Sequence, residues 1–538
     1  MESILVFEDW IVLGLYFLAL IGVAVWVVLQ KNKNTEDYFL AGRNVGWFVI
    51  GASIFASNIG SEHVVGLAGT GAESGMPMAH YELHAWIVLV LGWLFLPFYV
   101  RSKVFTMPEF LEKRFDSRSR WFLSLFSLVG YVITKVSVTI YAGGIVVSEL
   151  IGIPFWYGAI GIVLFTGLYT VVGGMKAVIY TETLQTIILI AGSVIITVLG
   201  LQEVGGWTTL KETVGSDHFN MWRPVSDPDF PWTGLLFGGT IVGIWYWCTD
   251  QYIVQRALAA NNIKIGRRGA IFGAYLKILP IFIFLIPGII AFALAKQGVL
   301  TYEKADEVFP LLVKTLLPVG LKGLVAGGLM AALMSSLASV FNSCSTIFTI
   351  DIYKKLKPDT PEKKLLNVGK LATVVMVVLG ILWIPIMQKI GGGVLYQYLQ
   401  SVQSYIAPPI TAIFLLGVLW KRVNAKAAII TLFSGLGIAT LRIIAEIFRD
   451  DLTGILYAFA TINFAHMAIF MFIFSVMLCI GVSLITNPPN YAAITGLSFG
   501  TLTDEQKLED KKSFTTIDIM LSVVLVLIVI IILSYFVG

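Results

Sequence analysis

The feature that most constrains the fold is the recurrence of apolar runs about as long as a bilayer is thick. One such run extends from Trp10 to Leu29, and comparable runs follow along the chain of 538 residues. A helix needs roughly 20 apolar residues to cross the hydrocarbon core of a membrane. Hydrophobic residues make up 57 % of the sequence and charged residues 13 %, whereas about 25 % of the residues of a soluble domain are charged. The sequence therefore predicts an all-α integral membrane protein.

About fourteen transmembrane helices are expected, in a single membrane domain over residues 1–538. Acidic residues rather than Lys or Arg precede the first run, and it has no small-residue cleavage site, so we expect a retained helix instead of a signal peptide. We expect the spans near 9–30, 45–70, 77–100, 120–148, 154–173, 175–202, 232–256, 268–295, 309–353 (a short helix and a long one), 366–388, 394–420, 424–447, 456–485 and 515–537.

The distribution of Lys and Arg predicts the orientation in the membrane. Basic residues gather in loops such as 101–120, 255–269 and 353–364, whereas turns such as 70–75 carry almost no charge. Roughly 25 basic residues fall on one side and roughly 7 on the other, and the basic side is retained in the cytoplasm. An even number of spans in the plasma membrane then places both termini outside the cell.

Several function classes are not indicated by the sequence. Cys248, Cys344 and Cys479 lie in apolar runs without ligand-like spacing, and the five histidines are scattered, so neither a disulfide framework nor a metal centre is expected. No nucleophile with an adjacent base is found, which argues against an enzyme. Nothing indicates nucleic acid or an organic cofactor. We expect the bilayer and a small solute as the partners.

Two apolar runs are interrupted by polar residues in corresponding places. "FASNIGSEHVVG" spans 55–66 and "WYWCTDQYIVQR" spans 245–256. If the first span is set aside, 45–202 and 232–420 each hold five expected helices, and an odd count inverts the second set relative to the first. Paired interruptions in inverted repeats mark the binding site of many transporters. A channel would instead need a continuous polar pore.

Polar residues at this depth need a reason. Asn58 and His63 would be costly against lipid, so we expect them to line a cavity, whereas Gly51 and Ser53 are expected to serve helix packing. Glu82 lies several residues from any loop, which indicates either a functional role or a buried structural ion pair.

Other charged groups leave alternatives open. Lys277 is either functional or extends toward the membrane boundary. For Lys135 and Glu182 the sequence does not separate pairing from function. Asp250 and Arg256 lie near the end of their span, where a solvated inner gate or a salt bridge is expected. His84 follows Glu82 by two residues and is expected to point to a different helix face, in a structural role.

The residue types suggest a hydroxyl-rich ligand and a hard cation. Carboxylate, amide, imidazole and ammonium groups suit the hydroxyls of a sugar, and Tyr246 and Trp247 offer faces on which a sugar ring stacks; interfacial anchoring is the alternative for these two aromatics. Ser335 and Ser336, together with carbonyls of an unwound helix near Ala56 and Ile59, offer the oxygen ligands that sodium prefers. Helix packing is the alternative for the serines.

From about Asp37 to Arg422 the chain resembles the solute:sodium symporters, and within them the sodium/glucose cotransporter branch. The resemblance lies in "NIGSEHVVGLAGTG", "GLYTVVGGMKAVIYTETLQT", "WYWCTDQYIVQR", "MSSLASVFNSCSTIFTIDIY" and "YLQSVQSYIAPPITAIFLLGVLWKR". It implies a LeuT-type inverted repeat of five plus five helices, with one extra helix before it and three after it in 424–538.

The resemblance also implies roles for individual residues. The sugar-contacting positions correspond to Asn58, His63, Glu82, Tyr246, Trp247, Lys277 and Gln400. The inner gate corresponds to Tyr246, and the hydrophobic outer gate to Leu67, Tyr81 and Tyr396. The sodium site corresponds to the carbonyls of Ala56, Ile59 and Ala332 and the hydroxyls of Ser335 and Ser336.

Four departures from the family pattern affect what is expected. Relatives thought to carry two sodium ions have Thr where this chain has Ala338, and Glu182 replaces the usual Asp, which indicates one sodium per substrate. Leu83 stands where sugar carriers usually have Trp, and Gly243 lacks a polar side chain found in some relatives. The resemblance implies sodium symport of a glucose- or galactose-type sugar by alternating access. The stretch "GSEH" also resembles the inositol carriers, so a cyclic polyol such as myo-inositol, or another small organic solute, is the alternative.

Overall fold

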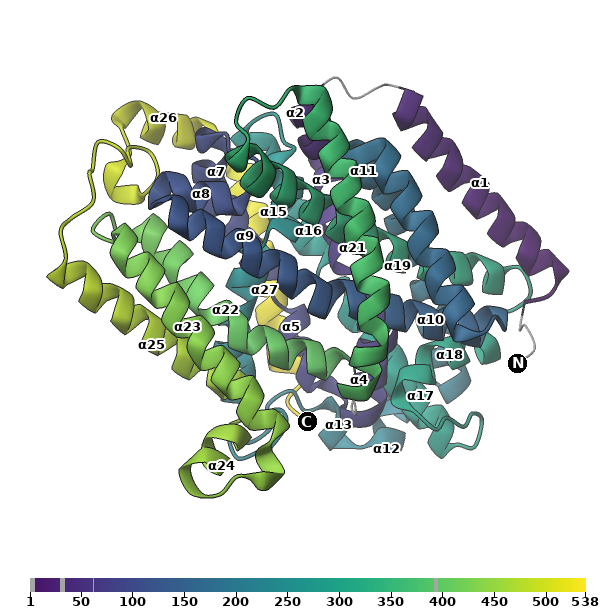
Figure 1. Cartoon of the computed structure of the whole chain (residues 1–538). Coiled ribbons are helices and arrows are strands. Elements are labelled where there is room, and N and C mark those ends of the chain that lie inside the picture. The colour runs from purple at the N-terminus through teal and green to yellow at the C-terminus, as the bar shows by residue number, and fades with distance from the viewer. Residues whose placement is uncertain (1–4, 30–33, 61, 391–394) are drawn as a thin grey trace.

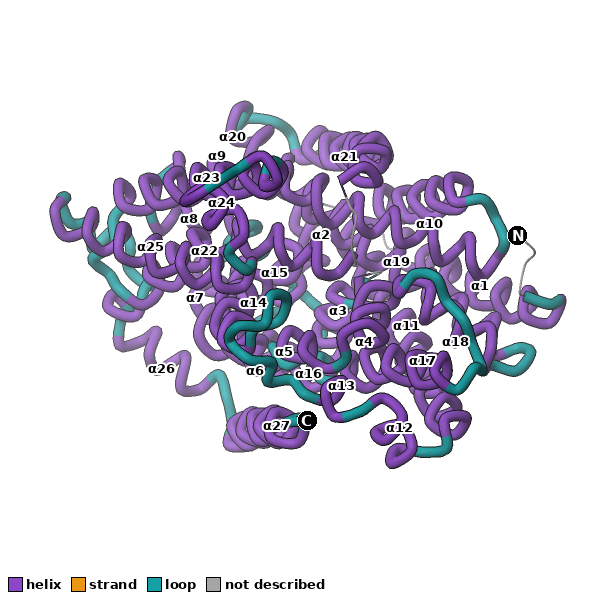
Figure 2. The backbone as a smooth tube through the Cα atoms, turned by 90° about the horizontal axis from the view of Figure 1, so that it is seen from below, coloured by secondary structure: helices purple, strands orange, loops and turns teal. Residues whose placement is uncertain are grey.

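The computed structural model describes residues 5–29, 34–60, 62–390 and 395–538, and regular structure in these ranges is helical (Figures 1 and 2). Extended backbone pairs there only at isolated bridges, one between Val45 and Ala260 and one between Asn220 and Val537. Apolar helices lie side by side and cross the molecule from one end to the other. The predicted all-α membrane architecture is confirmed.

The α-helices cover most of the chain. Their bounds are α1 (Phe7–Leu29), α2 (Thr35–Leu40), α3 (Trp47–Asn58), α4 (Ala68–Ser74), α5 (Ala79–Glu82), α6 (Ala85–Val90), α7 (Leu96–Ser102), α8 (Met107–Arg114), α9 (Ser117–Tyr131), α10 (Ser137–Ile151), α11 (Phe155–Val204), α12 (Trp207–Val214), α13 (Ser216–Phe219), α14 (Gly239–Ile244), α15 (Gln251–Leu258), α16 (Ile263–Leu276), α17 (Ile286–Lys296), α18 (Val308–Leu316), α19 (Leu321–Thr346), α20 (Lys354–Leu356), α21 (Glu362–Ile390), α22 (Leu395–Leu419), α23 (Ala425–Ile447), α24 (Gly454–Thr461), α25 (Phe464–Ile485), α26 (Asp504–Lys512) and α27 (Thr516–Tyr535).

In the described ranges, 11 helical segments are long and apolar enough to cross a membrane, and the bent pair formed by α3 and α4 adds one more. The helix α11 runs for 50 residues and changes direction at Gly174, whose φ is 62°, between the two spans expected at 154–173 and 175–202. A shorter apolar helix, Gly234–Thr249, precedes the second expected interruption. The number of about fourteen spans and the division into two inverted repeats stay predictions.

Both predicted interruptions are present. The helix α3 ends at Asn58, because Ile59 has extended backbone angles (φ −81°, ψ 99°). A π-helical turn over Glu62–Leu67 then leads into α4, and the two halves differ in direction by 64°. In the second interrupted helix Asp250 is extended (φ −78°, ψ 126°) and caps α15. Each interruption ends one helix and starts another within the apolar interior.

Glycines allow the first interrupted helix to lie close to α16. A Cβ atom at Gly51 would lie 2.7 Å from the carbonyl oxygen of Gly269 and 3.0 Å from the amide nitrogen of Gly273. The predicted packing role of Gly51 is therefore confirmed. The packing role expected for Ser53 is incomplete, because its hydroxyl donates a hydrogen bond to the Glu182 carboxylate.

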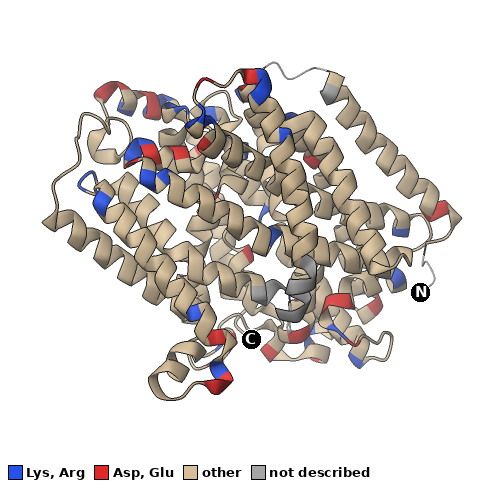
Figure 3. Ribbon diagram, in the orientation of Figure 1, with Lys and Arg blue, Asp and Glu red and all other residues tan. Residues whose placement is uncertain are grey.

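Charge is unequally distributed between the two ends. Figure 3 shows more Lys and Arg at the end that carries α2, α8 and α26 than at the opposite end. At the basic end, Arg120 of α9 binds the carboxylates of Asp351 at 2.7 Å and Glu112 at 2.5 Å, and it joins α8 to the π-helical turn that follows α19. In Figure 1 the start of α1 is the lower end of that helix, away from the basic end, and the end of α27 lies in the lower half of the picture.

The close approach of α4 and α17 yields a test of the packing. A Cβ atom at Gly288 would lie 2.0 Å from the carbonyl oxygen of Ala68, so the backbones must separate if Gly288 is replaced by Ala. We expect G288A to lower the free energy of unfolding by about 1–3 kcal/mol, the usual cost of an overpacked site. The measurement is thermal unfolding of the purified protein in detergent.

The matched control is Gly437 in α23, where no atom lies within 4 Å of an added Cβ. G437A should leave stability unchanged or raise it by up to about 1 kcal/mol, because Ala favours a helix more than Gly does. Equal melting temperatures for the two variants would contradict the described packing of α4 on α17.

Candidate functional site

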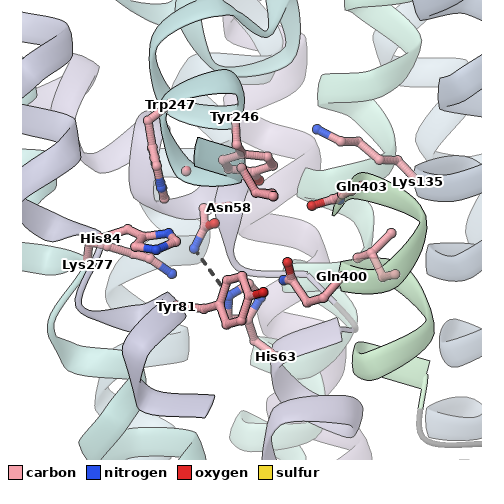
Figure 4. Close-up of a pocket in the computed structure, with 13 residues that line it drawn as sticks. Asn58, His63, Tyr81, His84, Lys135, Tyr246, Trp247, Lys277, Gln400 and Gln403 are labelled. Atoms are coloured by element: carbon pink, nitrogen blue, oxygen red, sulfur yellow. Dashed lines mark hydrogen bonds between the residues drawn. The ribbon is translucent and has the colours of Figure 1, made fainter. Parts of the chain in front are cut away.

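A buried cavity lies where the two interrupted helices meet the segment α5–α6 and the helices α16 and α22 (Figure 4). Its volume is about 40 Å³, which is enough for a few water molecules. Its walls combine amides, imidazoles, lysines and aromatic rings. The lining residues are Asn58, His63, Tyr81, His84, Lys135, Val242, Gly243, Tyr246, Trp247, Lys277, Leu399, Gln400 and Gln403.

A chain of polar contacts forms one wall. The ammonium of Lys277 lies 2.5 Å from one carboxylate oxygen of Glu82, and the other oxygen lies 3.4 Å from Nε2 of His63. The same ring nitrogen is 3.3 Å from the amide nitrogen of Asn58. Glu82 and Lys277 are almost completely buried, so their pairing removes the cost of leaving either charge alone in the interior. Extension of Lys277 to the membrane boundary is excluded.

Helix ends place these groups. Glu82 is the last residue of α5, Lys277 follows the end of α16, and His63 lies in the π-helical turn between α3 and α4. These three side chains lie at helix ends or in an irregular turn, and this local departure from regular α-helix lets them point toward one another. Glu82 does not itself line the cavity; it holds His63 and Lys277, which do.

Aromatic rings and a second ion pair close the opposite part of the wall. Lys135 Nζ lies 2.7 Å from the Asp250 carboxylate, 4.4 Å from the centre of the Tyr246 ring and 3.7 Å from that of Tyr252. A cation at such distances is attracted by the π-electrons of the ring. Lys135 therefore pairs with Asp250 and not with Glu182. Trp247 lines the cavity, with the Lys277 ammonium 5.5 Å from its ring centre.

Of the remaining predicted residues, some line the cavity and others do not. Gln400 lines the cavity, and its side-chain oxygen has no hydrogen-bond partner among the residues that the structure describes. Tyr81 also lines the cavity, whereas Leu67 is buried and does not line it. The side chain of Tyr396 lies outside the described part of the structure. The gate roles of these residues stay predictions.

Three polar lining residues were not predicted as site residues: His84, Lys135 and Gln403. The spacing of Gln403 was a usable signal, because residues three apart on a helix share a face and Gln400 was already assigned. For Lys135 the sequence leaves pairing and function open, and it does not indicate Asp250 as the partner. His84 was expected to be structural, but it lies in an irregular turn between α5 and α6, and its ring reaches the cavity.

A set of oxygen atoms lies beside the cavity, at the end of α3. The hydroxyl of Ser335 donates to the Ala56 carbonyl at 2.7 Å and lies 3.3 Å from the Ala332 carbonyl. The hydroxyl of Ser336 lies 3.4 Å from the Ser57 carbonyl. Helix ends leave carbonyls without intrahelical partners and carry partial negative charge, which favours a cation. Ile59, whose backbone is extended, directly follows the end of α3 and so lies next to these carbonyls.

These oxygens suit a weakly bound hard cation rather than a transition metal. Among the residues described, no group of three or more His, Cys, Asp or Glu side chains is arranged to hold a metal ion. Neutral carbonyl and hydroxyl oxygens are the ligands that hard cations prefer. All five residues predicted for the cation, Ala56, Ile59, Ala332, Ser335 and Ser336, are buried.

A third buried carboxylate lies close to these serines. Glu182 accepts hydrogen bonds from the hydroxyls of Ser53 and Ser339, from Ser57 at 3.2 Å and from the guanidinium of Arg256 at 3.2 Å. Arg256 is fully buried and Asp250 is nearly so. Of the two alternatives expected here, the salt bridge is present at both residues, and neither side chain is exposed to solvent in this structure.

Comparisons with known proteins agree with this geometry. A family model described as the sodium:solute symporter family matches residues 38–435. The chain is 40 % identical to a rabbit (Oryctolagus cuniculus) sodium/glucose cotransporter 1 over 89 % of this chain and 78 % of the relative. It is 39 % identical to a human (Homo sapiens) sodium/myo-inositol cotransporter 2 over 92 % and 79 %.

Solved structures give the same picture. A structure of a Na⁺-coupled sialic acid symporter superposes with a TM-score of 0.77 and 26 % identity, and covers 90 % of this chain and 99 % of its own. A nucleobase–cation symport transporter superposes with a TM-score of 0.51 and 13 % identity, over 89 % and 99 %, which shows the shared fold alone. The LeuT-type fold is thereby confirmed.

The pair of Glu82 and Lys277 yields a stability test. Replacing Lys277 by Met should lower the free energy of unfolding by about 3–5 kcal/mol, because an uncompensated carboxylate remains buried. Replacing Glu82 by Gln in the same protein removes that charge, so E82Q/K277M should recover most of the loss. Thermal unfolding of the single and double variants measures this coupling.

Lys296, which is exposed in the last turn of α17, supplies the control. K296M should change stability by less than about 0.5 kcal/mol. If the effects of E82Q and K277M simply add, the two side chains do not form the pair described here.

Proposed function

The chain belongs to the sodium:solute symporter family, and on that premise we propose that it is a secondary active transporter that carries a monosaccharide or a cyclic polyol into the cell together with sodium. One observation carries the proposal. The last turn of α3 supplies Asn58 to the polar cavity and the Ala56 carbonyl to the adjacent oxygen set. Two ligands at such neighbouring places favour the same conformation of one unwound helix, which is the condition for coupling.

The chemistry of the cavity supports a substrate rich in hydroxyl groups. Asn58, Gln400 and Gln403 each offer amide donors and acceptors, and Lys277 offers only donors. Tyr246 and Trp247 add ring faces for the C–H face of a sugar. Relatives named for glucose and for myo-inositol are about equally similar to this chain. We therefore propose a hexose as the substrate and keep a cyclic polyol as the alternative.

Sodium is the co-transported ion and is treated as a second substrate. Ala56, Ala332, Ser335 and Ser336 would supply its oxygens, and the extended backbone at Ile59 would supply another carbonyl. Without a carboxylate ligand, the ion would be held weakly enough to leave, as a carrier requires. The hydroxyl of Ser335, which donates to the Ala56 carbonyl here, would turn its oxygen to the ion.

The cycle that fits these contacts is alternating access. Sodium at the end of α3 favours an assembled polar cavity, and substrate then closes the outer gate formed by Leu67, Tyr81 and Tyr396. Most of the residues that line the cavity are buried, so side chains of the wall must move to admit a hexose. Tyr246 is proposed to act as the inner gate and to move when substrate is released.

We propose one sodium ion per substrate. Ala338 brings no hydroxyl to a second ion, and the Glu182 carboxylate is already neutralised by Arg256. A single charge crossing about 100 mV yields about 2.3 kcal/mol, and a tenfold sodium gradient adds about 1.4 kcal/mol. Together they support accumulation of several hundredfold, so one ion suffices.

The proposed location is the plasma membrane, with both termini outside the cell. The unequal distribution of Lys and Arg in Figure 3 supports this orientation, because basic residues are retained on the cytoplasmic side. We further propose that the protein transports its substrate without altering it chemically.

The decisive test is uptake by proteoliposomes that contain the purified protein. We expect accumulation of labelled D-galactose, D-glucose or myo-inositol that requires an inward sodium gradient and is lost when choline replaces sodium. Competition among the three compounds identifies the substrate class. Counterflow should occur, and the substrate recovered from the vesicles should be chemically unchanged. Uptake that is equally fast in choline would contradict sodium symport, and absence of counterflow would indicate a channel.

The cation site has its own test. S335A and S336A each remove a hydroxyl from the oxygen set, so we expect the sodium concentration for half-maximal uptake to rise about tenfold in each variant, the effect of roughly 1.4 kcal/mol. Ser345, on the same α19 helix, donates to the Gly369 carbonyl instead, and S345A should leave this concentration unchanged. The ratio of sodium to substrate flux in the wild-type vesicles should be close to one. Unaltered sodium dependence in both site variants would place the ion elsewhere.

A further inference from the structure

His84 is a polar side chain of the cavity wall that the proposed function has not yet used. It is 6 % exposed and lines the cavity (Figure 4). In the described part of the chain neither of its ring nitrogens has a hydrogen-bond partner, although the ring contacts that of Tyr81 at 5.4 Å between centres. A buried imidazole in this position needs water or a ligand to satisfy its nitrogens.

The His84 ring packs against Gly239 and Gly243, two glycines of α14. A Cβ atom at Gly243 would lie 2.8 Å from Nδ1 of His84 and 3.0 Å from its Cε1. A Cβ atom at Gly239, one turn earlier, would lie 3.5 Å from Nε2 of the same ring. Residues four apart share a helix face, so the imidazole spans both positions. Gly243 therefore leaves the space that the His84 ring occupies.

Close packing of helix backbones is the usual reason for small residues at this spacing in membranes, but the contacts here differ. The atoms nearest to a Cβ at Gly243 belong to the side chains of Ile87 and His84. At Gly239 the nearest atoms are side-chain atoms of His84 and Tyr81, all at ordinary van der Waals distance. The backbones of α14 and α6 thus do not require glycine. At Gly243 it is the His84 ring, together with the Ile87 side chain, that leaves no room for a Cβ atom.

Figure 4 shows His84 and Lys277 on one side of the cavity and Gln400 and Gln403 on the other. We propose that His84 is a substrate-binding and specificity-determining residue, which hydrogen-bonds a hydroxyl on the end of the substrate that faces away from Gln400. A neutral imidazole offers one donor and one acceptor, and a hydroxyl can complement either. This inference rests on the proposed function and names the group that recognises one end of that sugar or polyol.

The test compares monodeoxy analogues as competitors of labelled uptake. The labelled probe is D-galactose, D-glucose or myo-inositol, whichever wild-type vesicles accumulate with sodium. In the wild type one analogue, lacking the hydroxyl that faces His84, should compete about tenfold less well than the parent compound. In H84A this difference should disappear, while the ranking of the other analogues and the sodium dependence stay unchanged. Selective loss of one discrimination separates recognition from a structural role.

The control in the same segment is His80, which is buried, lies 3.1 Å from the Met221 carbonyl and does not line the cavity. H80A should retain the wild-type ranking of all analogues. H84A that weakens every analogue equally, or none, would overturn the inference while sodium-coupled uptake by the wild type still stands. Absence of sodium-dependent uptake in the wild type would overturn both.

A second pair of variants decides the question if H84A does not fold. G243A places a methyl group 2.8 Å from the ring and should displace it, so discrimination against the same analogue should fall. G239A places a methyl group at ordinary contact distance and should leave discrimination within about twofold of the wild type. Equal behaviour of the two glycine variants would show that the position of the ring does not govern selectivity.

Discussion

The structure depends on how the unwound end of α3 is satisfied inside the membrane. Where a helix stops in hydrocarbon, its last carbonyls have neither water nor the next turn as partners, and each would cost several kcal/mol if left alone. Here α19 supplies hydroxyls from Ser335 and Ser336 to these carbonyls. The same groups are those that would bind sodium. Structural need and the proposed ion binding would therefore use one set of atoms, and the site would be weak because protein hydroxyls already complete it without the ion.

The charged groups follow the same logic. Four ionisable side chains near the two interruptions form two buried pairs, Lys135 with Asp250 and Glu182 with Arg256. Neither pair is a stabilising device in itself, because burial costs both charges their hydration. Both pairs hold the segment where the second interrupted helix resumes: Asp250 also caps α15, and Arg256 lies six residues further along the chain, within α15. Pairing thus sets the geometry of the inner side of the cavity.

The sequence was sufficient for the membrane architecture and for both interruptions, since long apolar runs and polar breaks within them are local patterns. It also brought together Asn58, Lys277 and Gln400, with the help of a family resemblance. It did not decide which charges pair, because Lys135 and Asp250 are more than 100 positions apart and pairing depends on how the helices pack. It also did not show that the His84 ring reaches the cavity, because the direction of this side chain depends on an irregular turn that breaks the regular helical period.

One contact joins the two interrupted helices directly. The hydroxyl of Tyr252, in α15, donates a hydrogen bond to the Ser57 carbonyl at the end of α3. Tyr252 also lies under the Lys135 ammonium, and its own carbonyl accepts from Arg256 at 2.6 Å. A displacement of α15 therefore reaches the carbonyls of the proposed ion site through one side chain. Because Tyr246, the proposed inner gate, belongs to the same interrupted segment, opening of the gate would also loosen the proposed ion site. Such an arrangement would let sodium and substrate be released on the same side without a long chain of intermediate contacts.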